Sequence, residues 1–193
     1  MSRAASHGPN QAVSALSERL GDLLALGDDA FVERGPALLQ AAIRDPTFFD
    51  GVATDPAPAD SYTRRKVVGD PGSHVVRFME WPPGYSLLPH EHHGRPCFEV
   101  LVDGLLVVVD MVAHEAGHDE YELRILDSHV LHPGDAAVVD PRVNDIHAVY
   151  SPVRSRSLHV YPDDAAFAVG YCLGDNDRYT RTRFELDRDS SRP

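Results

Sequence analysis

The segment WPPGYSLLPHEHH (81–93), followed by CFEVLVDGLLVVVDM (97–111), decides the fold of this chain. It begins with a Pro- and Gly-rich stretch, reaches the pair His90 and His92, and continues into a strand-like run with a turn at Asp103-Gly104. Residues two apart on a strand point to the same face, so the two histidines can bind one ion. Short strands joined by Pro and Gly turns are typical of a sandwich or a barrel.

A second stretch, HPGDAAVVDPRVNDIHAVY (132–150), extends this pattern. It has a Pro-Gly-Asp turn before another strand-like run, and His147 in that run could complete a facial set of three ligands. Non-haem iron oxygenases usually add a carboxylate to two histidines, whereas three neutral donors leave the full charge of the ion for an anionic substrate group such as a thiolate. The alternative is that these are ordinary surface or core histidines, because the chain has 11 histidines and an H-x-H pair also arises by chance.

Length and composition limit the classes of protein to which this chain can belong. A chain of 193 residues with 42% hydrophobic and 25% charged residues fits one soluble domain with a sizeable core. Its net charge of −12 argues against nucleic-acid binding, which needs a basic face. No apolar run reaches membrane-spanning length and the N-terminus lacks the apolar core of a signal peptide, so we expect a cytoplasmic protein, taken to be a monomer, without membrane contact. In that reducing compartment a disulfide between Cys97 and Cys172 is not expected.

The first part of the chain carries helical patterns. We expect residues 1–11 to be disordered. Apolar residues at helical spacing then predict a helix over 12–26. Asp29 is expected to cap a second helix that ends at Asp45-Pro46, because the residue before a proline disfavours helical geometry.

The rest of the chain is predicted to consist of short strands and turns. The predicted strands are 62–68, 74–81, 97–103, 105–112, 120–127, 135–139, 146–151, 155–161, 166–173 and 178–186. The helical segment (12–46) and these strands are expected to form a single domain over 12–186, followed by a frayed tail at 187–193. The predicted fold is therefore mainly β.

Five motifs occur in order along this second part. They are Tyr62-Thr63-Arg64, Trp81 with Gly84, His90 with His92, Cys97-Phe98, and Ser157-Leu158-His159-Val160-Tyr161, with His147 between the last two. With this order and spacing, the chain from Tyr62 to Tyr161 resembles the cysteine dioxygenase family of cupin-type thiol dioxygenases. The two N-terminal helices are also similar to those of that family. The resemblance implies a single cupin-type jelly-roll β-barrel with N-terminal helices.

The resemblance also implies the roles of the site residues. The implied ligands of Fe(II) are His90, His92 and His147. The implied substrate-binding residues are Arg64, which would hold a carboxylate, Tyr62 and Trp81. The implied catalytic residues are Tyr161, His159, Ser157 and Cys97, the last joined to Tyr161 by a thioether. The implied reaction is the oxidation of L-cysteine, or a closely related small thiol acid, by O2 to its sulfinic acid.

Strand alternation supports an inward-facing site independently. Ser157, His159 and Tyr161 lie two apart, so they share one side of a strand, and buried polar side chains need the partners that a metal and a polar ligand supply. The alternative is an outward, solvent-facing set. Arg64 has a similar alternative as part of a solvated charge run, although Arg64 and its neighbour Arg65 point to opposite faces.

Several residues leave other functions open. Glu91 stands where the family commonly has Asp, and His93 could compete for the metal or line the pocket entrance. Cys97 occupies the place of a glutamate ligand in a generic cupin, and Glu99 could be a fourth ligand in an isomerase-type cupin. The remaining alternatives are the same three-histidine site acting on a different carboxylate-bearing substrate, and a non-catalytic cupin that binds a metal or a small ligand.

Overall fold

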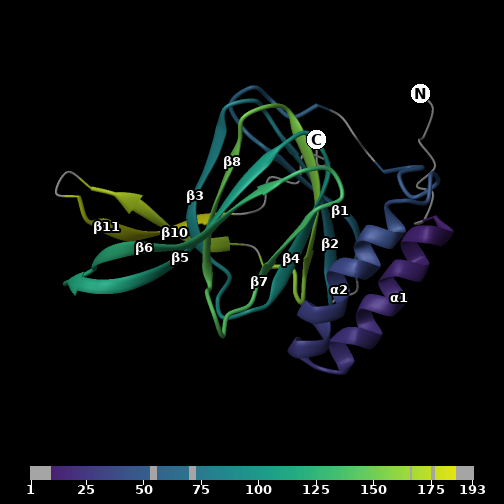
Figure 1. The fold of residues 1–193 in the computed structure, drawn as a ribbon, viewed down its shortest axis with the longest axis horizontal. Coiled ribbons are helices and arrows are strands. Elements are labelled where there is room, and N and C mark those ends of the chain that lie inside the picture. Colours follow the sequence, from purple (N-terminus) through teal and green to yellow (C-terminus); the bar gives the residue numbers. More distant parts are fainter. Residues whose placement is uncertain (1–9, 53–55, 70–72, 166, 175–176, 186–193) are drawn as a thin grey trace, which may run out of the picture.

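Two layers of strands, with two helices packed on one side, form the body of the protein (Figure 1). The computed structural model describes residues 10–52, 56–69, 73–165, 167–174 and 177–185. The helices are α1 (Gln11–Ala25) and α2 (Asp28–Ala42). The strands are β1 (Thr63–Gly69), β2 (Val75–Trp81), β3 (Tyr85–Glu91), β4 (Cys97–Asp103), β5 (Leu106–Gly117), β6 (Glu120–Leu131), β7 (Ala136–Val139), β8 (Ile146–Ser151), β9 (Ser155–Tyr161), β10 (Phe167–Leu173) and β11 (Tyr179–Glu185).

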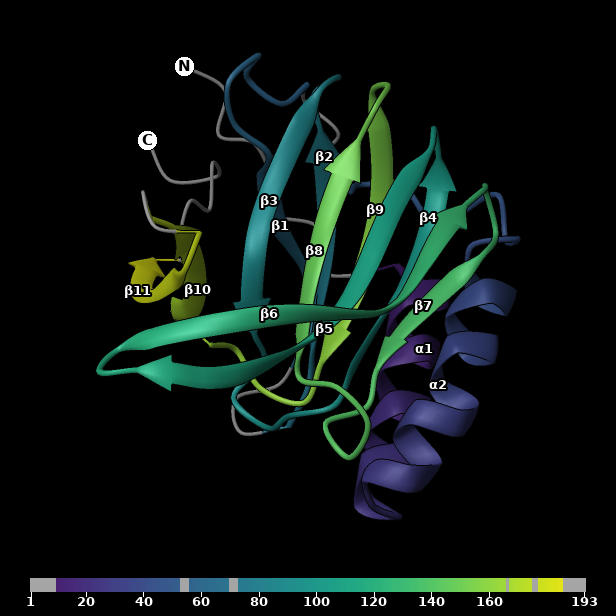
Figure 2. The ribbon, with the colours of Figure 1, turned by 60° about the vertical axis from the view of Figure 1, so that its left-hand side comes forward.

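The strands form a jelly-roll type β-sandwich. One sheet has the order β1-β2-β9-β4-β7, and the other, β10-β11-β6-β5-β8-β3, closes through pairing of β10 with β3. Figure 2 shows α1 and α2 on one side of the first sheet, where α2 contacts β4 and β7 and α1 contacts β1. The expected mainly β, jelly-roll fold with N-terminal helices is confirmed.

The predicted strands all have observed counterparts, with two differences. The hairpin of β5 and β6 is longer than predicted and projects from the body beside β10 and β11 (Figures 1 and 2). The strand β3 was not predicted, although it carries His90. Pro89 lies inside it, and the ladder with β8 shifts between Leu87 and His90. A proline cannot donate to a ladder, so this sequence does not look like a strand in isolation.

The helix ends differ from the sequence-based expectation. The expectation of disorder is wrong at residues 10 and 11, because Asn10 caps α1 by accepting a hydrogen bond from the Val13 amide at 2.9 Å. Asp29 does not cap α2, because Gly27 takes the N-cap position with φ 105° and Asp28 and Asp29 lie in the first helical turn. Carboxylates are favourable there because the helix N-terminus carries partial positive charge. Residues 1–9 and the predicted tail at 187–193 lie outside the described residues.

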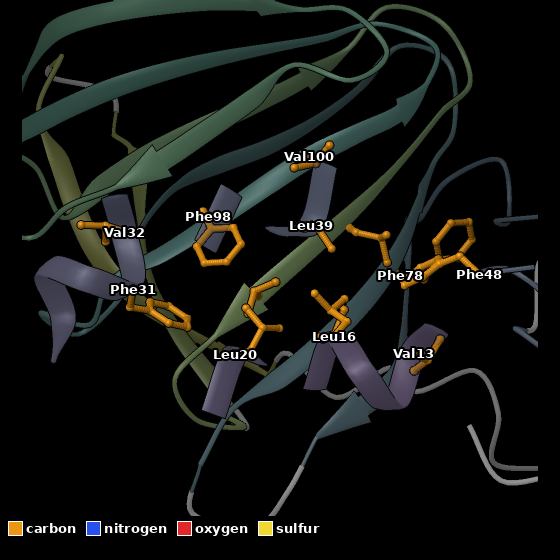
Figure 3. Close-up of a cluster of buried hydrophobic side chains, with 13 residues drawn as sticks. Val13, Leu16, Leu20, Phe31, Val32, Leu39, Phe48, Phe78, Phe98 and Val100 are labelled. Carbon is orange, nitrogen blue, oxygen red and sulfur yellow. The ribbon is translucent and has the colours of Figure 1, made fainter. Parts of the chain in front are cut away.

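Alternating residues of the first sheet face two different environments. Phe78, Phe98 and Leu158 face the helices, where Phe98 packs on Phe31 with ring centroids 5.1 Å apart (Figure 3). The residues between them face the second sheet. These include the buried apolar side chains Met79, Trp81 and Leu101 and the polar side chains Ser157, His159 and Glu99. One face of the sheet therefore makes the main core, and the other forms the wall of the site.

Among the described residues no helix is long and apolar enough to span a membrane.

Candidate metal centre

Two neighbouring strands of the second sheet bring three histidines together. His90 lies on β3 directly opposite His147 on β8, and His92 follows the end of β3. Nitrogen atoms of all three, one from each ring, lie within 4.8 Å of one another. Within the described ranges, this is the group of three or more histidine, cysteine or acidic residues that could hold a metal ion.

Backbone carbonyls hold two of these rings in one orientation. Nδ1 of His90 lies 2.9 Å from the Leu88 carbonyl oxygen, and Nδ1 of His92 lies 3.2 Å from the Asp145 carbonyl oxygen. A carbonyl only accepts, so each Nδ1 carries the hydrogen and each Nε2 keeps its lone pair free. Nδ1 of His147 is buried without a hydrogen-bond partner. The arrangement of His90 and His92 fits a metal ion, because ligating histidines need one unprotonated nitrogen and a partner for the other.

Burial keeps the three rings uncharged at neutral pH. Desolvation lowers the pKa of His90 to about 4 and that of His92 to about 3, with further lowering of the His92 pKa by nearby His90. The pKa of His147 also lies well below its usual value, first through burial and then through its two neighbours. Neutral imidazoles are ligands for iron, zinc, copper and nickel.

Glu91, the residue between the paired histidines, anchors this end of β3. The Tyr171 hydroxyl on β10 donates to Glu91 Oε1, and Nη2 of Arg181 on β11 lies 2.8 Å from Glu91 Oε2. The carboxylate therefore ties the ligand-bearing strand to the last hairpin. Nothing in the local sequence pointed to Tyr171 or Arg181, because the pairing of β10 with β3 joins residues about 80 positions apart.

A cavity of about 360 Å³ opens beside the histidines. Its lining includes His90, His92, Tyr62, Arg64 and Tyr161. Arg64 is only 3% exposed, its guanidinium carbon lies 5.2 Å from the centre of the Tyr161 ring, and its Nε and Nη1 have no hydrogen-bond partner. A buried cation without an anion is costly, so this cavity is suited to a carboxylate.

The two arginines of the first motif do separate to opposite faces. Nη1 of Arg65 lies 3.8 Å from the Glu80 carboxylate, away from the cavity that Arg64 lines. The alternative of a solvated charge run is wrong for both, because each is buried. His93 has φ 57° and lines the cavity with its Nε2 3.3 Å from the Phe167 carbonyl oxygen. It is therefore a pocket residue outside the metal group.

The polar residues of β9 form one buried chain. Ser157 Oγ lies 2.8 Å from His159 Nε2, and the Tyr161 hydroxyl lies 3.4 Å from His159 Nδ1. The indole of Trp81 donates to Ser157 Oγ at 2.8 Å and stacks on Tyr62 with ring centroids 5.1 Å apart. An outward, solvent-facing arrangement is therefore wrong. Trp81 supports Tyr62 and Ser157 and is not among the residues that line the cavity.

The register of β4 on β9 places two further residues. Phe98 is opposite Val160, so Cys97 falls next to Tyr161 along the same pair of strands. Burial raises the pKa of the Cys97 thiol well above its usual value. Glu99 lies opposite His159 with its Oε2 2.9 Å from His159 Nε2. Glu99 is not part of the metal group, so the four-ligand arrangement is not supported.

Cys97 and Cys172 are both free thiols in the structure.

No family model and no curated protein matches the sequence. Among solved structures, the chain is similar to an oxalate oxidase in complex with the substrate analogue glycolate, with 16% identity, coverage of 68% of this chain and 69% of that chain, and a TM-score of 0.47. It is similar to an RmlC-like cupin from Shewanella frigidimarina, with 16% identity, coverage of 60% and 88%, and a TM-score of 0.45. It is also similar to KdgF from Halomonas sp., with 17% identity, coverage of 58% and 87%, and a TM-score of 0.41.

Proposed function

We propose that the protein is an iron-dependent thiol dioxygenase that oxidises L-cysteine, or a closely related small thiol acid, to its sulfinic acid. The observation that carries the proposal is that one cavity is lined both by His90 and His92, two of the three grouped neutral histidines, and by the buried Arg64, whose Nε and Nη1 have no hydrogen-bond partner. The histidines suit a divalent ion whose charge remains available to a thiolate, and the guanidinium suits a carboxylate. A small thiol acid supplies both anionic groups.

The overall reaction needs no further reductant. Conversion of a thiol to a sulfinic acid removes four electrons from sulfur, and one O2 accepts four electrons and supplies both new oxygen atoms. Fe(II), when bound, would supply the place where the sulfur and O2 react. The three histidines would hold it, because each has a nitrogen without a proton at neutral pH.

The side chains around the cavity would bind and orient the substrate. The Arg64 fork would hold the carboxylate in two-point geometry, and Tyr62 beside it is held in place by stacking on Trp81. Tyr161 would present its hydroxyl to the reacting groups, because the ring lies under the Arg64 guanidinium and His159 contacts its oxygen. Fixed positions of this kind lower the entropic part of the barrier.

A thioether between Cys97 and Tyr161 is part of the proposal. The two residues fall side by side on β4 and β9, and Cys97 is buried. Forming the bond removes one hydrogen from each residue, and O2 would be the oxidant. The bond would fix the position of the Tyr161 ring without changing the metal ligands.

A second candidate is the same site acting on a larger carboxylate-bearing substrate. A further cavity of about 330 Å³ shares Tyr62 and Arg64 with the first and is lined also by Tyr85 and Phe184. A carboxylate held by Arg64 could therefore carry a bulkier group into this second space. The expected monomeric state and cytoplasmic location remain proposals.

Metal analysis and oxygen uptake test the proposal. The purified protein should carry about one iron per chain, and His90→Ala and His147→Ala should both lose it. With iron restored, L-cysteine should consume O2 and yield its sulfinate, whereas cysteamine, which lacks a carboxylate, should be a poor substrate.

The role of Arg64 is tested with a matched control. Arg64→Ala should mainly raise KM, because uniform binding of the carboxylate is lost, whereas Lys66→Ala, an exposed position on the same strand, should have little effect. Better turnover of cysteamine than of cysteine would contradict the role of Arg64. Full iron retention in both histidine variants would contradict the metal site itself.

A further inference from the structure

Arg64 lines two neighbouring cavities, of which the first contains the metal-site histidines His90 and His92. The second cavity has a volume of about 330 Å³ and shares Tyr62, Arg64 and Leu87 with the first. Its volume lies within the range of small-molecule sites, which is about 300–1,000 Å³. Arg64 is buried, and its Nε and Nη1 have no hydrogen-bond partner. A carboxylate bound by Arg64 would therefore stand at the boundary between the two spaces.

Three aromatic rings, those of Tyr62, Tyr85 and Phe184, line the second cavity. The Tyr62 ring centroid lies 5.6 Å from that of Tyr85, and Tyr62 is held from another side by stacking on Trp81. The Phe184 ring packs edge-on against His90 with ring centroids 6.1 Å apart. Flat apolar walls that are fixed by their own neighbours suit a planar group of a ligand.

The Phe184 ring has its place because a glycine lies beside it. A Cβ on Gly170 would lie 2.8 Å from Cε1 and 3.1 Å from Cδ1 of this ring. Gly170 on β10 is paired with His90 on β3. The ring therefore reaches the metal-binding strand across a position that has no side chain. The closure of the second sheet thus builds this wall of the cavity.

Opposite charges lie at the two ends of the second cavity. Arg64 is buried at its inner end, whereas Asp60 and Glu185 are exposed at its rim. Ser86 and Thr182 add hydroxyl groups to the lining. Among the described residues that line this cavity, Arg64 is the one basic side chain. Such a site suits a ligand that carries a carboxylate at one end and a cation at the other.

The chemistry of cysteine decides how one ligand can use both cavities. Its α carbon bears a carboxylate, a methylene with the thiol, and a nitrogen. If Arg64 holds the carboxylate and the thiol points to the histidines of the first cavity, the nitrogen is the substituent left to enter the second cavity. An aminoacyl group on that nitrogen adds a planar amide for the aromatic walls and an ammonium for the acidic rim.

We propose that the second cavity binds the aminoacyl group of a dipeptide whose C-terminal residue is cysteine; this inference rests on the proposed thiol dioxygenase function. The thiol gains both atoms of one O2 and becomes a sulfinic acid, the peptide bond stays intact, and no further reductant takes part. Free cysteine fills the first cavity alone, so it is the more weakly bound of the two substrates.

Binding of an unreactive analogue tests the subsite without turnover. In L-alanyl-L-serine an oxygen replaces the reactive sulfur, and calorimetry on the full-length protein without O2 compares it with L-serine and with N-acetyl-L-serine, which lacks the ammonium. Alanyl-serine should bind at least about tenfold more tightly than serine, because each buried methylene-sized group is worth about fourfold in affinity. An affinity for alanyl-serine no greater than that for serine or for N-acetylserine would overturn the inference.

Filling the second cavity should abolish the preference for the dipeptide. Thr182 on β11 lines the second cavity but not the first, so Thr182→Trp should weaken alanyl-serine binding at least about tenfold and change serine binding less than about twofold. The control is Thr180→Trp, at an exposed position of the same strand outside both linings, which should change neither. If Thr182→Trp does not fold, Ser86→Trp fills the same cavity from the exposed side of β3. Unchanged binding of alanyl-serine to the filled variant would overturn the inference.

Oxygen uptake separates this inference from the proposed function. L-alanyl-L-cysteine should have a kcat/KM at least about tenfold above that of L-cysteine, because uniform binding is gained. L-cysteinyl-glycine, in which the cysteine carboxylate is blocked, should be a poor substrate. Turnover of cysteine without turnover of alanyl-cysteine would overturn the inference alone. If neither consumes O2, the thiol dioxygenase activity is contradicted, and the binding results still decide the subsite.

Discussion

Metal binding by the three histidines should depend only weakly on pH in the mildly acidic range. Protons compete with a metal for imidazole nitrogen, so an ordinary histidine site loses its metal as the pH falls through about 6.5. Here burial lowers the pKa of His90 to about 4 and that of His92 to about 3, and it lowers the pKa of His147 in the same direction. A histidine with a lowered pKa stays neutral until the pH falls to that lowered value.

The magnitude follows from the neutral fractions of the rings. At pH 5.5, His90 with a pKa of about 4 is roughly 97% neutral, and His92 with a pKa of about 3 is more so. Burial shifts the pKa of His147 in the same direction. Three histidines with the usual pKa of about 6.5 would each be roughly 9% neutral, so all three together would be neutral in roughly one molecule in a thousand. The affinity should therefore change less than about twofold between pH 7.5 and 5.5, instead of about a thousandfold.

Titration calorimetry with Zn(II) at several pH values measures this dependence directly. His147→Ala serves as the control that lacks the complete site. A loss of affinity greater than about tenfold between pH 7.5 and 5.5 would show that the rings gain protons in this range, and the reasoning from burial would then be refuted.

Three other changes have defined outcomes. Glu91→Gln should weaken metal binding by about ten- to a hundredfold in equilibrium dialysis, because Glu91 anchors the ligand strand to the last hairpin; unchanged affinity would contradict this role. Gly35→Ala should lower the free energy of unfolding by about 1–3 kcal/mol despite the helix propensity of Ala, because a Cβ there would lie 2.4 Å from the Phe98 ring; a higher melting temperature would show that the ring moves easily. Aerobic turnover should produce a protein species about 2 Da lighter, as expected for loss of two hydrogens, that is absent from Cys97→Ser and Tyr161→Phe; a Cys97 that stays fully alkylatable in an active enzyme would speak against the thioether.

Local patterns in the sequence were sufficient for most elements and for the metal ligands. Apolar residues at helical spacing identified α1, and alternating residues identified most strands, because both patterns depend on near neighbours in the chain. The spacing of His90 and His92 and the strand context of His147 predicted their grouping for the same reason. The sequence missed β3 because Pro89 interrupts its pattern, and pairing with β8 and β10 supplies what the local sequence lacks.

The tertiary structure alone decided which polar residues meet. Glu99 was open as a fourth metal ligand, and only the register of β4 on β9 places it against His159. Tyr171 and Arg181 reach Glu91 only because the last hairpin closes the second sheet against β3. Arg64 could have been a solvated charge, and only its burial beside Tyr161 makes it a cation that needs an anion. Such contacts depend on strand register between distant segments, which side-chain periodicity within one strand does not specify.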